Sequence, residues 1–221
     1  MVIQQPDLGT SILIAGTGII IIWLAGLNIK YFVYSGLLLI VSLPFAVSLL
    51  KPYQKSRILT FFNPDRDPLG AGYQIIQSKI AIGSGGFFGK GFLKGTQSYL
   101  EFLPEKHTDF IFTLFSEEFG FLGSIMLLLL YILLIYRIIS IGFYAKSFFS
   151  KLFCFGFASA IFLYIFVNIS MVLGLLPIVG APLPIMSYGG SSMLSIMLGL
   201  SIVTVSYTHL RCRRRVAGGG G

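Results

Sequence analysis

Apolar residues occur in five long runs along the chain, and polar segments separate them. A helix needs about 20 apolar residues to cross a bilayer, and each run approaches or exceeds that length. The pattern predicts an all-α integral membrane protein, a polytopic helix bundle with about five transmembrane helices. We place the spans at residues 11–27, 31–50, 110–136, 150–174 and 185–207.

The longest polar segment, residues 51–109, separates a front part with two spans, residues 1–50, from a back part with three, residues 110–207. Connections of this length in a compact protein are usually functional or disordered. The Ile, Phe and Tyr residues spread through this one argue against disorder. Its residues 73–82 predict an amphipathic helix at the membrane interface, with an apolar face formed by Tyr73, Ile76 and Ile80.

Basic residues near the short connections predict the orientation. Lys30 follows the first span, Arg137 and Lys146 lie between the third and fourth, and Lys151 lies at the start of the fourth. Short segments rich in Lys and Arg remain on the cytoplasmic side. We therefore expect residues 51–109 to form one long extracytoplasmic loop.

The composition, with 55% hydrophobic and 11% charged residues among 221, excludes a soluble domain. Half of the formal charge of +8 comes from four arginines in the tail, residues 208–221, which ends in four glycines. We interpret this tail as non-native and exclude it from the predicted fold; a native basic anchor is the alternative. We expect no signal peptide, and Cys154 and Cys212 suggest neither a disulfide framework nor a metal motif.

Six glycines lie between residues 83 and 95. They match neither GxxxxGK[ST] nor GxGxxG, so we expect neither a nucleotide loop nor a nucleic-acid partner. A backbone path with several positive φ angles is the better interpretation. Lys90 within this segment and Lys79 before it are candidates for binding a diphosphate.

A cluster of charged residues, Glu105, Lys106, His107 and Asp109, lies directly before the third span. Charged groups are costly in hydrocarbon, so such a cluster is expected to face water or its own members. This position suits a reaction on a membrane-bound substrate. The alternative is structural, with Thr108 or Asp109 capping the helix that follows.

Two carboxylates lie inside the third span. Glu117 falls about 80° from Asp109 around the helix axis and is a candidate for the same site, whereas Glu118 lies nearly opposite. A structural role for both is the alternative, because a carboxylate within a membrane must find a partner.

Small and neutral polar residues in the spans predict helix packing. Ser116, Gly120 and Ser124 recur every four residues and predict a close approach by another helix. Asn168 predicts a hydrogen bond between helices, or the lining of a polar cavity.

Three prolines and three glycines interrupt the apolar pattern between residues 177 and 192. Irregular backbone at membrane depth requires cover by protein or a wet cavity, so we expect this hairpin to pack beneath the long loop. Ser187 and Tyr188 are candidates for hydrogen bonds to a substrate there.

Four segments together resemble the SEDS family of peptidoglycan polymerases, and its rod-shape members more than its division members. They are QPDLGTS at 5–11, DPLGAGYQIIQSKIAIGSGG at 67–86, LPEKHTDFIF at 103–112 and PLPIMSYGGSS at 182–192. The match covers residues 3–207 in order and spacing. Family members have about ten spans, so the chain resembles their C-terminal half.

The resemblance implies a glycosyltransferase that extends glycan strands from lipid II at the outer face of the bacterial cytoplasmic membrane, in wall elongation, cell shape or division. Asp109 matches the family's essential aspartate. The implied partners are lipid II, a polyprenyl-diphosphate-linked glycan, membrane lipids and a class B penicillin-binding protein. The missing half implies that this chain alone is inactive.

Such a transfer requires a group that deprotonates the acceptor hydroxyl and a positive charge for the departing diphosphate. Asp109 is the candidate base or metal ligand, with Glu105, Lys106 and His107 beside it. A divalent cation, Mg²⁺ or Mn²⁺, or the lysines would stabilise the diphosphate. Two other functions stay open: a flippase or transporter for a lipid-linked precursor, and a non-enzymatic scaffold that recruits wall enzymes.

Overall fold

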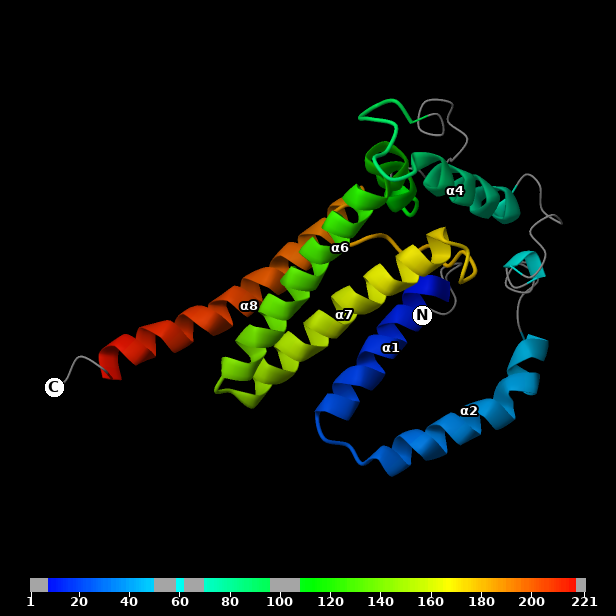
Figure 1. The fold of residues 1–221 in the computed structure, drawn as a ribbon. Coiled ribbons are helices and arrows are strands. Elements are labelled where there is room, and N and C mark those ends of the chain that lie inside the picture. The colour runs from blue at the N-terminus through cyan, green and yellow to red at the C-terminus, as the bar shows by residue number, and fades with distance from the viewer. Residues whose placement is uncertain (1–7, 50–58, 62–69, 96–107, 218–221) are drawn as a thin grey trace.

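The computed structural model describes residues 8–49, 59–61, 70–95 and 108–217, and every regular element in them is helical (Figure 1). The helices are α1 (Leu8–Leu24), α2 (Ile29–Leu49), α4 (Ala71–Gly85), α6 (Ile111–Tyr144), α7 (Phe148–Val172) and α8 (Gly190–Ala217).

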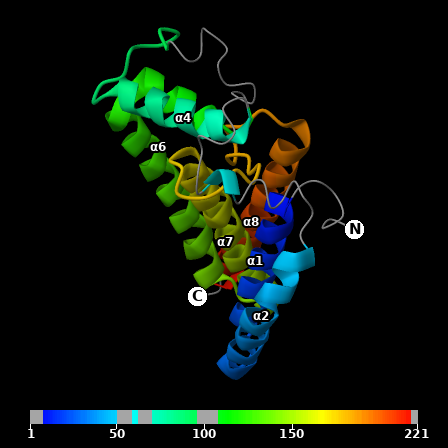
Figure 2. The same cartoon turned by 90° about the vertical axis from the view of Figure 1, so that its right-hand side faces the viewer.

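Helices α6 and α7 form an antiparallel hairpin at the centre of the molecule, with α1 against α7 and α8 against both (Figures 1 and 2). The helices approach closely where one of them carries a glycine. A Cβ atom added at Gly156 would lie 2.7 Å from Ile21, and one at Gly142 would lie 3.0 Å from Cys154. The apolar core includes Ile138 of α6 and Cys154, Ala158, Ile161 and Ile165 of α7.

Two helices, α6 and α7, are long and apolar enough to cross a membrane. Shorter apolar helical stretches occupy Gly9–Leu24, Ile29–Ser42 and Gly190–Val205. Many large apolar side chains on α2 and on the outer face of α6 are exposed, among them Leu38 and Leu133. A membrane protein presents such a surface to lipid.

The predicted spans agree with the helices except at two boundaries. Helix α6 continues to Tyr144, well beyond the predicted end at residue 136. Helix α8 begins only at Gly190 and continues to Ala217, through most of the tail that we excluded from the fold. The late start follows from the Pro- and Gly-rich sequence before it, because such residues do not sustain a helix.

Helix α4 lies across one end of the α6–α7 hairpin, as an interfacial helix should (Figure 2). Its buried face consists of Ile75, Ser78 and Ala81. The predicted apolar face was wrong: Ile80 is half exposed, and Tyr73 and Ile76 are only partly buried. The Ser78 hydroxyl lies 2.7 Å from the Val172 carbonyl oxygen, which joins α4 to the end of α7.

Helix α6 is broken at Gly120, whose φ of 67° and ψ of −163° are not helical. A short first part, Ile111–Phe119, therefore differs in direction from the long second part that starts at Phe121. Ser116 and Ser124 do not form a stripe on one straight helix; their hydroxyl oxygens lie 2.9 Å apart across the break. Gly120 contacts the backbone of Phe87, Phe88 and Gly89 instead of another helix.

The segment between α7 and α8, residues 173–189, contains no helix or strand. It begins under α4, because a Cβ atom added at Gly174 would lie 3.0 Å from Ile75 and 2.3 Å from the Lys79 side chain. This first turn precedes the predicted hairpin at residues 177–192, whose position beneath the long loop stays a prediction. We call residues 173–189 the hairpin loop.

Candidate active site

Asp109 lies just before α6. The start of α6 lies at the end of the molecule where α4 is found (Figure 1). The N-cap residue of α6 is Phe110, which makes no side-chain cap hydrogen bond. The N-cap position therefore belongs to neither Thr108 nor Asp109. Three other predicted site residues, Glu105, Lys106 and His107, lie outside the described residues.

Asn168, near the end of α7, holds the backbone at Asp109. Its side-chain Nδ2 donates to the Asp109 carbonyl oxygen at 2.8 Å and to the Ala181 carbonyl oxygen at 2.6 Å. The side chain is fully buried. One amide thus joins α7 to the turn just before α6 and to the hairpin loop. The sequence predicted a bond from Asn168 to another helix, and the bonds are made to two non-helical segments instead.

Ser187 holds the backbone at Thr108, the residue before Asp109. Its hydroxyl donates to the Thr108 carbonyl oxygen at 2.6 Å and accepts from the Leu183 N–H at 2.7 Å. Two buried side chains from different segments therefore fix residues 108 and 109 from the same side. We call Asn168 and Ser187 the backbone clamp.

The Asp109 carboxylate faces the hairpin loop at Gly180. A Cβ atom added at Gly180 would lie 3.5 Å from Asp109 Oδ2. Gly180 has a φ of 74°, which L side chains rarely adopt. Glycine at this position therefore permits both the turn and the approach of the carboxylate.

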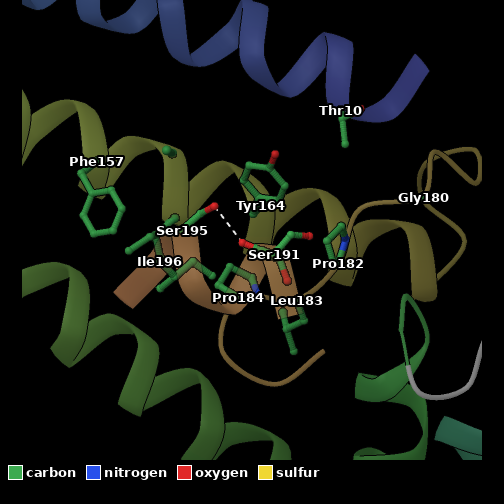
Figure 3. A pocket seen from close by; sticks show the side chains of 13 residues that line it. Thr10, Phe157, Tyr164, Gly180, Pro182, Leu183, Pro184, Ser191, Ser195 and Ile196 are labelled. Atoms are coloured by element: carbon green, nitrogen blue, oxygen red, sulfur yellow. Dashed lines mark hydrogen bonds between the residues drawn. The ribbon is translucent and has the colours of Figure 1, made fainter. Parts of the chain in front are cut away.

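Gly180 also borders a cavity of about 480 Å³ between α1, α7, the hairpin loop and α8 (Figure 3). The cavity is largely apolar, with a few hydroxyl groups. Figure 3 shows Thr10 pointing from α1 toward the hairpin loop, and the Ser195 hydroxyl donating to the Ser191 carbonyl oxygen. An apolar space beside a carboxylate suits an amphipathic molecule with a polar reacting end.

Tyr188 lies on the other side of the hairpin loop and is 84% exposed. It borders a hollow of about 620 Å³ with Ser187, Met186 and Ile111. Ile185 beside it has a positive φ of 70°, a strained conformation for a β-branched residue. A substrate-binding role for Tyr188 stays a prediction.

Lys90 and Glu117, two predicted site residues, are brought together by the structure. The Lys90 Nζ lies 2.7 Å from Glu117 Oε1; Glu117 is fully buried, and the Lys90 side chain is 28% exposed. Glu117 lies about 10 Å along α6 from Phe110, at 1.5 Å per residue. The ion pair therefore forms near the break in α6, and a direct part for either residue in binding substrate stays a prediction.

Lys79 lies over the first turn of the hairpin loop, with its Cε and Nζ atoms against Gly174. Its interaction with a diphosphate also stays a prediction. Among the described residues, no three His, Cys, Asp or Glu side chains gather as metal ligands. The Asp109 carboxylate alone is still compatible with Mg²⁺, which one or two carboxylates and substrate phosphates commonly hold.

Several known proteins are similar to the chain over most of its length. The chain is 50% identical over 210 residues to the peptidoglycan glycosyltransferase MrdB of Escherichia coli K12, and it covers 57% of that protein. It thus spans little more than half of this relative's length, and 95% of the chain itself is matched.

Solved structures give the same fold. A peptidoglycan synthase complex, described as coordinating polymerization and crosslinking, contains a chain that matches with a TM-score of 0.78 and 31% identity. The match covers 95% of this chain and 58% of that one. A mutant of the Rod shape determining protein RodA from Thermus thermophilus matches with a TM-score of 0.59 and 25% identity, over 94% of this chain and 52% of that one.

These matches confirm the predicted all-α polytopic membrane fold. The model of the FtsW, RodA and SpoVE family, described as cell cycle proteins, matches residues 1–211. The chain therefore belongs to the FtsW/RodA/SpoVE family, the family of peptidoglycan polymerases that its four motifs resemble.

Proposed function

We propose that this chain is the aspartate-bearing half of a peptidoglycan glycosyltransferase that polymerises lipid II. The observation that carries the proposal is the position of Asp109. Its backbone is fixed by Asn168, and its carboxylate faces Gly180 at the border of a largely apolar cavity. A lipid-linked sugar needs an apolar space for the lipid and a fixed carboxylate for the reaction.

In the proposed reaction, a sugar hydroxyl attacks the anomeric carbon of a lipid diphosphate. The new glycosidic C–O bond forms as the bond between the anomeric carbon and the diphosphate oxygen breaks. The diphosphate oxygen takes the bonding electron pair, and the diphosphate leaves still attached to its polyprenyl carrier. Asp109 takes the hydroxyl proton as general base. The backbone clamp holds Asp109 for this step, because small errors in position are costly to the rate.

A divalent cation, Mg²⁺ or Mn²⁺, is part of the proposal. It would neutralise the departing diphosphate, and Asp109 is the described carboxylate that could hold it. Lys106 and Lys79 are the alternative source of positive charge.

The proposed location is the bacterial cytoplasmic membrane, with the α4 end outside. The α1–α2 and α6–α7 connections lie at the opposite end (Figures 1 and 2), where Lys30, Lys146 and Lys151 occur. Basic residues at one end favour a cytoplasmic position for that end.

The proposed partner is a class B penicillin-binding protein that crosslinks the glycan, and the proposed role is wall elongation and cell shape. The matched chain from a complex of polymerization and crosslinking supports the partner, and the matched Rod shape determining protein supports the role.

The test is polymerisation of purified lipid II by the full-length protein and by the 221-residue chain, both in detergent. We expect glycan strands from the full-length protein only. Movement of lipid II across liposomes without strands would support a flippase instead, and neither activity would support a scaffold. Strands made by the chain alone would refute its dependence on the missing half.

A further inference from the structure

We infer that Lys90 and Glu117 are positioning residues: their ion pair fixes the first part of α6 and thereby the direction of Asp109. This inference rests on the proposed function. It differs from the sequence-based expectation, in which Lys90 binds diphosphate and Glu117 shares the Asp109 site. The glycine loop, defined as residues 86–91, connects the two residues to the break in α6.

The break in α6 folds its two parts against each other. Eight residues of a continuous α-helix span about 12 Å, yet the Ser116 and Ser124 hydroxyl oxygens lie 2.9 Å apart. The Ser124 hydroxyl also lies 2.9 Å from the Gly120 carbonyl oxygen. The direction of the first part is therefore set locally and does not follow from the direction of the long second part.

The glycine loop supplies the hydrogen bonds that the break removes from the helix. The N–H groups of Lys90 and Gly91 donate to the carbonyl oxygens of Glu117 and Glu118 at 3.1 and 3.0 Å. In return, the N–H groups of Phe121 and Leu122 donate to the carbonyl oxygens of Gly86 and Phe87 at 2.9 and 3.2 Å. Residues of the glycine loop thus provide hydrogen-bond partners for the helix backbone on both sides of Gly120, so the loop and the break form one structural unit.

The backbones meet too closely for side chains between them. A Cβ atom added at Gly89 would lie 2.1 Å from the Glu118 carbonyl oxygen, and one at Gly120 would lie 2.3 Å from the Gly89 nitrogen. Both glycines have positive φ angles, 77° and 67°. The glycines therefore permit the loop to enter the break.

The ion pair adds a side-chain connection to this unit. Glu117 is fully buried, so its carboxylate requires a compensating charge, and Lys90 supplies one at 2.7 Å. Without Lys90, this buried charge would lose that compensation, and the first part of α6 would shift to bring the carboxylate toward water.

The first part of α6 transmits such a shift to Asp109. Its other end is held by Asn168 and Ser187 through the carbonyl groups of Asp109 and Thr108. The distance from Asp109 to Glu117 is about 12 Å along a helix, so a small rotation at one end moves the other. A displacement of about 1 Å at a reacting group can lower the rate about 100-fold.

A double-mutant cycle in the full-length protein tests the inference. The variants are Lys90→Met, Glu117→Gln and the double variant, with Lys94→Met as a matched control because Lys94 is an exposed lysine of the same segment. We expect Lys90→Met to lower kcat for lipid II polymerisation about 10- to 100-fold with KM nearly unchanged. The double variant should recover most of this loss, because it leaves no buried charge without its partner.

A diphosphate-binding role predicts the opposite pattern. Lys90→Met would then raise KM, and removing the Glu117 charge as well would restore nothing. Either that result or wild-type kinetics for Lys90→Met would overturn the inference.

A measurement without substrate separates this inference from the proposed function. Asp109→Cys is introduced in a background without the native cysteines, and the rate of its modification by a water-soluble thiol reagent is followed. We expect Lys90→Met to change this rate about tenfold or more and the double variant to restore it. An unchanged modification rate would overturn the inference even if lipid II is polymerised. A changed and restored rate would support it even if the parent protein proved inactive toward lipid II.

Discussion

The two parts of α6, on either side of Gly120, have different surroundings although one long helical run of sequence contains both. In the first part, Ile111–Phe119, most residues are buried, including Phe112, Thr113, Leu114 and Glu117. In the second part, from Phe121 to Tyr144, most large side chains are exposed, among them Leu133. The first part begins beside Asp109, whereas the second belongs to a helix long and apolar enough to cross a membrane. A single apolar run in a sequence can therefore contain two elements with different surroundings.

Gly120→Ala should remove the boundary between the two parts and have the largest effect on stability. A Cβ atom there would clash with Gly89 and Phe87 in a backbone conformation that L residues avoid. We expect a loss of about 3–5 kcal/mol, measured by thermal unfolding in detergent. Gly83→Ala is the matched control, because nothing lies within 4 Å of the added Cβ atom. Equal stability of the two variants would mean that the break is not required.

Leu114→Ala and Leu133→Ala compare the two parts directly. Leu114 is 7% exposed and Leu133 is 57% exposed. We expect Leu114→Ala to cost about 2–4 kcal/mol through the cavity that it leaves, and Leu133→Ala to change stability by less than about 0.5 kcal/mol. A larger loss for Leu133→Ala would place the second part against protein instead of lipid.

Asn168→Leu should affect the rate more than Leu114→Ala does, although its effect on stability is smaller. The change leaves the carbonyl oxygens of Asp109 and Ala181 without their donor. We expect a loss of about 1–3 kcal/mol and a polymerisation rate about 10- to 100-fold lower. Ser159→Ala on the same helix is the control, because its hydroxyl bonds only to its own helix at Phe155. A stable variant with normal rate would show that the backbone clamp is dispensable.

Ser187→Ala should have the smallest effect, because Asn168 still holds Asp109. The Thr108 carbonyl oxygen and the Leu183 N–H each lose a partner. We expect a stability loss of about 1 kcal/mol and a rate reduction below tenfold. Ser201→Ala on α8 serves as control, because its exposed hydroxyl bonds to Met197 of its own helix. A rate loss for Ser187→Ala larger than that for Asn168→Leu would reverse the order of the two clamp residues.

Local sequence patterns predicted most of the membrane helices. The expected spans at residues 11–27, 31–50 and 150–174 each lie within three residues of the ends of α1, α2 and α7. Length and hydrophobicity decide such helices, and both are properties of a short window of sequence. Residues 185–189 were wrongly included in the last span, although Pro184, Gly189 and Gly190 signalled the late start of α8.

The features that long-range contacts decide could not be predicted in the same way. The break at Gly120 is stable because residues 86–91 supply its hydrogen bonds, and an isolated glycine in an apolar run does not reveal that partner. The buried face of α4 includes Ser78 because the Val172 carbonyl oxygen lies beside it. Asn168 was expected to bond to another helix, but its partners, 59 and 13 residues away in non-helical segments, follow only from the fold.

Asp109 is the residue on which the proposed function depends, and Asp109→Asn in the full-length protein tests it most directly. The amide keeps the size of the side chain but accepts a proton poorly and carries no charge for a cation. We expect the rate of lipid II polymerisation to fall about 10²- to 10⁴-fold. Thermal stability should stay within about 1 kcal/mol of the parent, because the clamp bonds reach the backbone of this residue. A variant that polymerises lipid II at nearly the normal rate would contradict the proposed role of Asp109, whatever its stability.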